Sequence, residues 1–175
     1  RFLERRRPGE NPLSTARSET DVPTFLSGLL DGQTCASPVC AVMENADARS
    51  ADYAALLDIP RPAHADYTAF VKWGGRADLR GGGHFSGRLT APLCVAGGIA
   101  KQILGRRSVF VGAHLLSVGS IEDQGFPERP SAGLFSQIAA KEFPVVDEAR
   151  GMRMQTLIKE AASEGDSVGG VVECA

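Results

Sequence analysis

The chain has 175 residues, 43% of them apolar and 23% charged, so it is long enough for one globular domain with a buried core. Its net charge of −2 and the absence of a basic face argue against duplex nucleic acid as a partner, and its longest uncharged apolar run (89–100) is too short to span a bilayer. Four scattered cysteines without a CxxC pair argue against a disulfide scaffold or a metal site and favour a cytoplasmic enzyme.

The first half of the chain is predicted as short strands and helical turns joined by polar loops. In chain order these are the end of a helix at 1–7, a loop at 10–21, a strand at 24–30, its partner at 38–44, and helical turns at 52–57 and 64–73. Pro8-Gly9 would end the first helix, and Asp31-Gly32 is a hairpin signal.

The second half is predicted as two longer helices and two strands. These are a helix at 87–104, a strand at 109–118, a loop at 119–133, a helix at 146–164 and a strand at 166–174. The helix at 87–104 is apolar on nearly every side, so we expect it to be buried. Paired strands with two or three helices indicate the α+β class in a single domain over 1–175.

The most informative stretch for chemistry is 74–88, which holds six glycines and three arginines. Consecutive glycines let backbone N–H groups approach an anion, and the following helix N-terminus adds oriented donors. Ser86 can donate from its hydroxyl, and Arg88 can clamp an oxyanion. The pattern predicts a phosphate cradle but matches neither the P-loop nor the dinucleotide fingerprint. A flexible surface turn has the same composition, and spacing alone does not separate the two.

Other candidate residues have a functional and a structural interpretation. Fifteen of the 19 basic residues are arginine, which suits anion recognition but also follows from GC-rich codons. Residues 5–9 are either a second cationic cluster or a solvated helix end. His64 is a candidate general acid or base, whereas His114, in an apolar strand, is expected to be structural. Trp73 is expected to pack, the cysteines to fill the core, and Asp66 to cap the helix at 64–73.

Four segments in order resemble the motifs of the chorismate synthase family. They are Arg-Arg-Arg-Pro-Gly at 5–9, Arg-Pro-Ala-His-Ala-Asp-Tyr-Thr at 61–68, Arg-Gly-Gly-Gly-His-Phe-Ser-Gly-Arg-Leu-Thr at 80–90, and Glu-Gly-Asp-Ser-Val-Gly-Gly-Val-Val at 164–172. The resemblance implies a sheet–helix–sheet sandwich, a cytoplasmic homotetramer, and a phosphate lyase. The implied reaction is trans-1,4 elimination of phosphate from 5-enolpyruvylshikimate 3-phosphate, which gives chorismate and requires reduced FMN. NADPH is a possible reductant.

The resemblance also implies roles for individual residues. His64 matches the histidine that lies near reduced flavin and donates a proton. Arg6 matches an arginine that contacts NADPH or the substrate anion, and Arg88 one that reaches the substrate. His84, Phe85 and Ser86 occupy the FMN-contacting triplet, where much of the family has Arg-Ser-Ser. Arg61 is expected to fix the loop of His64.

The resemblance further predicts that the chain is an internal segment, truncated at both ends. It begins in a charged run without Met and stops in an apolar run. The family is about twice as long, and its Gly-Glu-Ser-His-Gly motif, with a second catalytic histidine, would precede Arg1. We therefore expect the isolated chain to have little or no activity. Two alternatives are a non-catalytic phosphate- or flavin-binding module and a structural fragment that does not fold alone.

Overall fold

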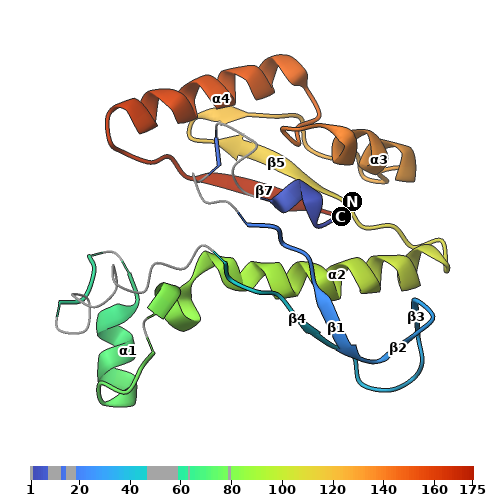
Figure 1. Ribbon diagram of the computed structural model, residues 1–175. Coiled ribbons are helices and arrows are strands. Elements are labelled where there is room, and N and C mark those ends of the chain that lie inside the picture. Colours follow the sequence, from blue (N-terminus) through green and yellow to red (C-terminus); the bar gives the residue numbers. More distant parts are fainter. Residues whose placement is uncertain (1, 8–12, 15–18, 47–58, 63, 79) are drawn as a thin grey trace. The chain divides into compact units, whose positions relative to one another are not determined.

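The computed structural model describes residues 2–7, 13–14, 19–46, 59–62, 64–78 and 80–175 (Figure 1). These residues form helices and antiparallel strands, which confirms the predicted α+β class. The chain divides into two compact units. Unit 1 comprises Arg1–Glu10 and Ala16–Gly98, and unit 2 comprises Asn11–Thr15 and Ile99–Ala175.

Unit 1 contains two small antiparallel ribbons. The strand β1 (Thr24–Ser27) pairs with β4 (Cys40–Val42), and β2 (Leu29–Leu30) pairs with β3 (Gln33–Thr34). The predicted hairpin is confirmed, because Asp31 and Gly32 both have positive φ, as a two-residue turn requires. The predicted strand at 24–30 is interrupted at Gly28, where φ is +85° and an added Cβ would lie 2.5 Å from the Val39 Cα. The backbone of the neighbouring segment therefore approaches too closely for any side chain.

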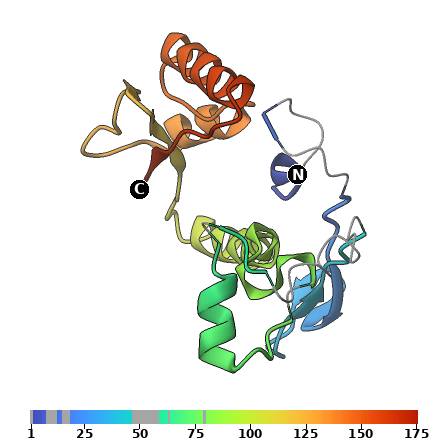
Figure 2. The same cartoon turned by 90° about the vertical axis from the view of Figure 1, so that its left-hand side faces the viewer.

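Helical segments of unit 1 carry the motifs. A 3-10 turn η1 (Glu4–Arg6) stands in the predicted helix end, and α1 (Asp66–Trp73) confirms the predicted helical turns. Two further 3-10 turns, η3 (Arg80–Phe85) and η4 (Gly87–Leu89), lead into α2 (Thr90–Gly105), as Figure 2 shows. The residues of α2 up to Gly98 belong to unit 1, and those from Ile99 onward belong to unit 2. The Ser86 hydroxyl begins η4 by accepting a hydrogen bond from Arg88 N.

The expected burial of α2 is wrong within this chain. Ala91 is buried, but Leu93 is 69% exposed and Ile103 49% exposed. An apolar surface makes a helix suited to burial, but only the elements packed on it decide whether it is buried. The cysteines likewise differ from the prediction of core packing, since three of them are exposed and Cys94 is half-buried.

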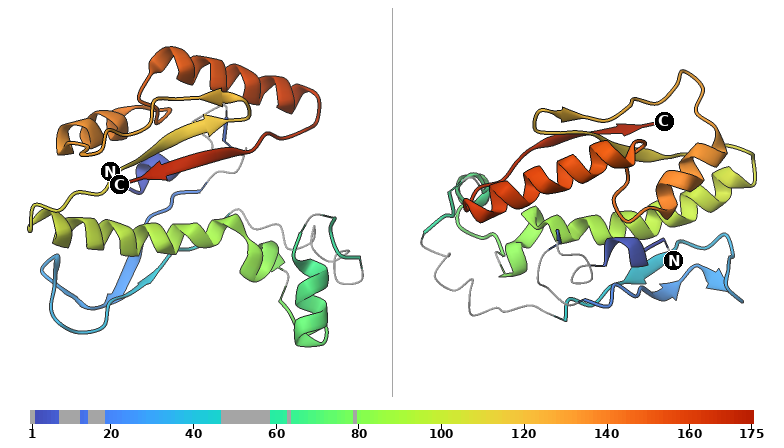
Figure 3. Two further views of the ribbon diagram at one scale, coloured as in Figure 1. Left: turned by 180° about the vertical axis from the view of Figure 1, so that it is seen from behind. Right: turned by 90° about the horizontal axis from the view of Figure 1, so that it is seen from above.

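Unit 2 is a three-stranded antiparallel sheet with two helices. Its strand order is β6 (Ile121–Glu122), β5 (Ala113–Val118), β7 (Gly170–Cys174), and Figure 3 shows it from behind and from above. The short strand β6 lies in the segment predicted as loop. The helices are α3 (Ala132–Ala140), which no prediction covered, and α4 (Glu148–Ser163), which confirms the predicted stripe.

Both helices have the N-terminal caps that hydroxyl and carboxylate side chains provide. Ser131 accepts a hydrogen bond from Leu134 N, and Asp147 accepts from Ala149 N. On α4, Met154 is fully buried against Val118 and Val145, and this trio is the centre of the hydrophobic core. The core of unit 2 thus joins the middle strand to α4.

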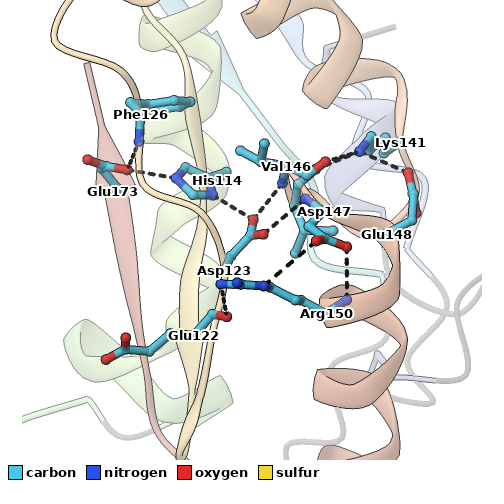
Figure 4. A network of polar contacts seen from close by, with 11 residues as sticks. His114, Glu122, Asp123, Phe126, Lys141, Val146, Asp147, Glu148, Arg150 and Glu173 are labelled. Carbon is cyan, nitrogen blue, oxygen red and sulfur yellow. Dashed lines mark hydrogen bonds and ion pairs between the residues drawn. The ribbon is translucent and has the colours of Figure 1, made fainter.

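A buried polar network also holds unit 2 together (Figure 4). His114 on β5 lies with Nδ1 3.2 Å from Asp123 Oδ2 and Nε2 2.8 Å from Glu173 Oε2 on β7. Asp123 also accepts from the backbone N–H groups of Val146 and Asp147, just before α4. Burial raises the pKa of Asp123, but these backbone donors and His114 lower it by more, so the net pKa lies below its ordinary value. The expectation that His114 is structural agrees with these contacts.

Two predicted features of the first half of the chain lie outside the described residues. The predicted helix stop at Pro8-Gly9 and the helical turns at 52–57 lie in segments that the structure does not describe. Among the described helices, none combines the length and hydrophobicity needed to cross a bilayer.

Candidate functional site

The two arginines predicted to hold anions lie on either side of one carboxylate in unit 1. Arg6 Nη1 donates to Asp21 Oδ2 at 2.7 Å, and Arg88 Nη1 forms an ion pair with Asp21 Oδ1 at 2.5 Å. The Asp21 side chain is only 1% exposed. Residues separated by more than eighty positions are therefore brought together by a buried counterion.

The two guanidinium groups differ in how many of their donors the protein occupies. Arg88 Nη2 lies 3.5 Å from Glu19 Oε2, and Arg88 Nε donates to Asn45 Oδ1 at 3.3 Å. Arg6 Nη2 instead donates to the neutral hydroxyl of Thr90 at 3.0 Å. Two arginines thus face two buried carboxylates, and Arg6 has the weaker set of competing acceptors.

The glycine-rich loop is shaped by its own hydrogen bonds. Gly83 has a φ of +56°, and an added Cβ would lie 2.2 Å from the Asp78 carbonyl oxygen. Ser86 N donates to Gly83 O, Leu89 N to Ser86 O, and Arg88 N to the Ser86 hydroxyl. These three N–H groups are used within the loop, so they are not available to an anion. The phosphate cradle expected from the N–H groups of the consecutive glycines stays a prediction.

Aromatic rings connect this loop to α1 and to His64. Phe85 stacks on Trp73 with ring centroids 5.8 Å apart, and Trp73 lies 6.1 Å from His84. The ring of His64 meets Phe85 edge-on, with centroids 6.3 Å apart. Trp73 and Phe85 remain 38% and 37% exposed. The cluster therefore offers partly exposed planar surfaces beside an imidazole.

His64 is held by the motif in which it lies. Arg61 donates to both oxygens of Asp66, from Nε to Oδ2 at 2.7 Å and from Nη2 to Oδ1 at 2.9 Å. His64 Nδ1 lies 2.7 Å from the same Oδ1. The hydrogen bond from the Arg61 guanidinium holds the pKa of the Asp66 carboxyl far below its usual range, although burial alone would raise it.

These contacts confirm one expectation about the motif and correct another. Arg61 fixes the loop, as predicted, through its bonds to Asp66. Asp66 does not cap α1, because Ala65 is the N-cap residue and no side chain bonds to the first helical N–H groups. The carboxylate instead points back to Arg61, also accepting from its backbone N at 3.1 Å.

Sequence reasoning missed Glu19 and Asp21. Both lie at the end of the polar segment predicted as loop or just before β1, and both are 4% exposed. Their spacing of two residues was the available signal. Polar segments rarely contain buried carboxylates, and the burial of these two depends on groups distant in the sequence: Arg6 and Arg88, and the N–H of Ala46, which donates to Glu19 Oε2 at 3.0 Å.

Comparisons with known proteins give one consistent result. A family model described as chorismate synthase matches residues 1–175. The chain is 40% identical to the chorismate synthase of Lancefieldella parvula, covering 99% of this chain and 48% of that protein. It is 42% identical to that of Thermococcus kodakarensis, covering 99% and 46%. The chain therefore spans about half the length of the curated relatives it matches.

A solved structure supports the same relationship at the level of the fold. A crystal structure of chorismate synthase matches with a TM-score of 0.68 at 24% identity, over 99% of this chain and 47% of the other. At this identity the match shows a shared fold.

Proposed function

This chain belongs to the chorismate synthase family, and we propose that it supplies anion-binding arginines and a flavin-side imidazole for that enzyme's reaction. In that reaction, 5-enolpyruvylshikimate 3-phosphate loses phosphate from C3 and a proton from C6, and chorismate is formed. The observation that supports the proposal most is the continuous set of contacts in unit 1. Asp21 joins Arg6 to Arg88, and the loop that carries Arg88 also places Phe85 against His64.

The residues present fit a reduced flavin, which we propose to be FMN. Partly exposed Trp73 and Phe85 offer planar surfaces of the kind that stack on an isoalloxazine ring, and His84 and Ser86 flank Phe85 with polar groups. Bound reduced FMN would supply an electron that helps to expel the phosphate and would then recover it. His64, at the edge of Phe85, would hold or deliver a proton on that side of the ligand.

We propose that Arg6 makes the primary contact with the substrate anion, or with NADPH where this serves as reductant. The second contact of Arg6 is with the Thr90 hydroxyl, which is neutral. Arg6 Nη2 can therefore exchange this hydroxyl for a phosphate or carboxylate oxygen without breaking an ion pair. Arg88, more fully engaged by Glu19, Asp21 and Asn45, would reach the substrate with its remaining N–H and would otherwise hold the site together.

We also propose the properties of the whole protein that the family implies. These are a cytoplasmic homotetramer, in which 1–175 forms part of one domain, and a requirement for segments outside 175 residues before turnover occurs. The non-catalytic binding module stays the alternative. It predicts flavin or phosphate binding that no complementing segment converts into turnover.

The test is a chimera in which residues 1–175 replace the matching part of the Thermococcus kodakarensis chorismate synthase. We expect chorismate formation with reduced FMN, and flavin retention that increases when the substrate is present. Arg6→Gln should weaken substrate binding about tenfold to a hundredfold, as the loss of a charge-assisted hydrogen bond implies. Arg76→Gln, at an exposed arginine outside the cluster, is the matched control.

Two results would contradict the proposal. A folded chimera that binds reduced FMN but forms no chorismate would favour the non-catalytic module. Equal substrate affinity in the Arg6→Gln and Arg76→Gln chimeras would remove the role given to Arg6. Separately, turnover by the isolated chain would contradict the expected need for further segments.

A further inference from the structure

His64 Nδ1 has two neighbours, a hydrogen-bond acceptor and a donor, which require opposite protonation states of this nitrogen. Asp66 Oδ1 lies 2.7 Å away, and an ionised carboxylate only accepts hydrogen bonds. Arg61 Nη2 lies 3.2 Å away, and a guanidinium only donates. Bonding to Asp66 requires a hydrogen on Nδ1, whereas accepting from Arg61 requires a bare Nδ1. The partner to which Nδ1 is bonded therefore determines which ring nitrogen carries the hydrogen and which one presents a lone pair to a ligand.

The geometry points to Asp66 as a positioning residue that fixes His64 in the Nδ1–H tautomer and leaves Nε2 as the nitrogen that exchanges a proton with the ligand. The proposal rests on the role proposed above for His64. The contact to Asp66 is the shorter of the two, and Arg61 already directs Nη2 to the same Oδ1 at 2.9 Å. One of the two N–H groups of Nη2 is used in that bond, which leaves only the other for the longer contact to Nδ1.

Three further observations support this assignment. The Asp66 side chain is 1% exposed, so water does not compete for Oδ1. The depressed pKa of the carboxyl keeps it ionised, and therefore an acceptor, over the working range of any enzyme near neutral pH. The edge contact with Phe85 restricts rotation of the imidazole, so Nδ1 and Nε2 do not exchange places freely.

The experiment is long-range ¹H–¹⁵N NMR on the chain labelled at histidine, recorded at a pH where His64 is neutral. In the parent chain we expect a pyrrole-type Nδ1 and a pyridine-type Nε2, the reverse of the tautomer that histidine favours in water. In Asp66→Asn, the amide oxygen stays with Arg61 and the NH₂ group turns to Nδ1, so the two signals should exchange types. In Asp66→Glu, a carboxylate is retained and Nδ1–H should persist.

Arg61→Gln is the matched control, because it breaks the same ion pair but leaves the carboxylate. We expect it to keep Nδ1–H. A parent chain with Nε2–H would overturn the proposal whatever the variants do, and so would a tautomer unchanged in a folded Asp66→Asn chain. Exchange in Arg61→Gln would also overturn it, since the loop rather than the carboxylate would then set the tautomer. Reduced-FMN binding is measured on the same samples, so its loss with the tautomer intact would count against the proposed function alone.

Discussion

Replacing Asp21 by Asn tests whether one buried carboxylate holds Arg6 and Arg88 together. Asp21 has a φ of +50°, a left-handed conformation that Asn also tolerates. The two side chains have nearly the same shape, so the substitution keeps the backbone and the volume and removes the charge. A change in stability can then be assigned to the two contacts with the guanidinium groups.

The expected magnitude follows from those contacts. The hydrogen bond from Arg6 to Asp21 contributes about 1.5–3 kcal/mol to the free energy of unfolding, and the ion pair between Asp21 and Arg88 adds to it. Asn keeps one acceptor oxygen, so one arginine keeps a weakened bond, while the other arginine faces an NH₂ group that cannot accept. Because the side chain at position 21 is only 1% exposed, water does not come between the NH₂ group and the arginine it faces, although the Arg6 and Arg88 side chains are 22% and 16% exposed. We expect the free energy of unfolding of unit 1 to fall by about 2–4 kcal/mol.

The assay is urea unfolding followed by the fluorescence of Trp73, the single tryptophan of the chain, which lies in unit 1. Asp31→Asn is the matched control, because Asp31 has the same φ of +50° but is exposed in the turn between β2 and β3. The control should change the free energy of unfolding by less than about 0.5 kcal/mol. If Asp21→Asn changed it by no more than the control does, the bridging role of Asp21 would be refuted.

Three other substitutions test the remaining structural conclusions. Met154→Ala should destabilise unit 2 by about 2–5 kcal/mol, measured by amide hydrogen exchange on β5, because it opens a cavity in the core. Asp123→Asn should have a lower free energy of unfolding than the parent chain above about pH 4. The difference should shrink as the pH falls, because the folded-state pKa of Asp123 lies below its ordinary 3.8. A difference in the free energy of unfolding that stays constant with pH would contradict this. Gly83→Ala should destabilise unit 1 by more than about 1 kcal/mol, because its Cβ would meet the Asp78 carbonyl at positive φ. Gly87→Ala, with open space at the Cβ, should be near neutral.

Local signals in the sequence located those elements that are determined by nearby residues. The Asp31-Gly32 turn, α1 and α4 all follow from turn chemistry or from a helical stripe. The strand β6 has two residues and is defined only by pairing with β5, so no local pattern marks it. The exposure of α2 also lies beyond local pattern, because burial depends on which elements pack against a helix.

The candidate site shows the same division between local and long-range information. Motif order alone indicated Arg6, His64, the triplet at 84–86 and Arg88. It did not indicate that the N–H groups of Ser86, Arg88 and Leu89 would be used within the loop, because that depends on the 3-10 turns around Gly83 and Ser86. Nor did it indicate the buried Glu19 and Asp21. Their burial requires cations that the chain supplies from positions both before and far after them.

Those two carboxylates bear on which ligands the cluster can select. With two arginines and two buried carboxylates, the cluster carries no net charge, so a singly charged anion gains little by approaching it. A ligand must offer Arg6 a better acceptor than the Thr90 hydroxyl while leaving the Asp21 bridge intact. A phosphate dianion meets this requirement, because its several oxygens can accept from the free edge of Arg6 with more charge than a carboxylate brings. With the role proposed for Arg6, the buried carboxylates would therefore favour selection of phosphorylated ligands over general attraction of anions.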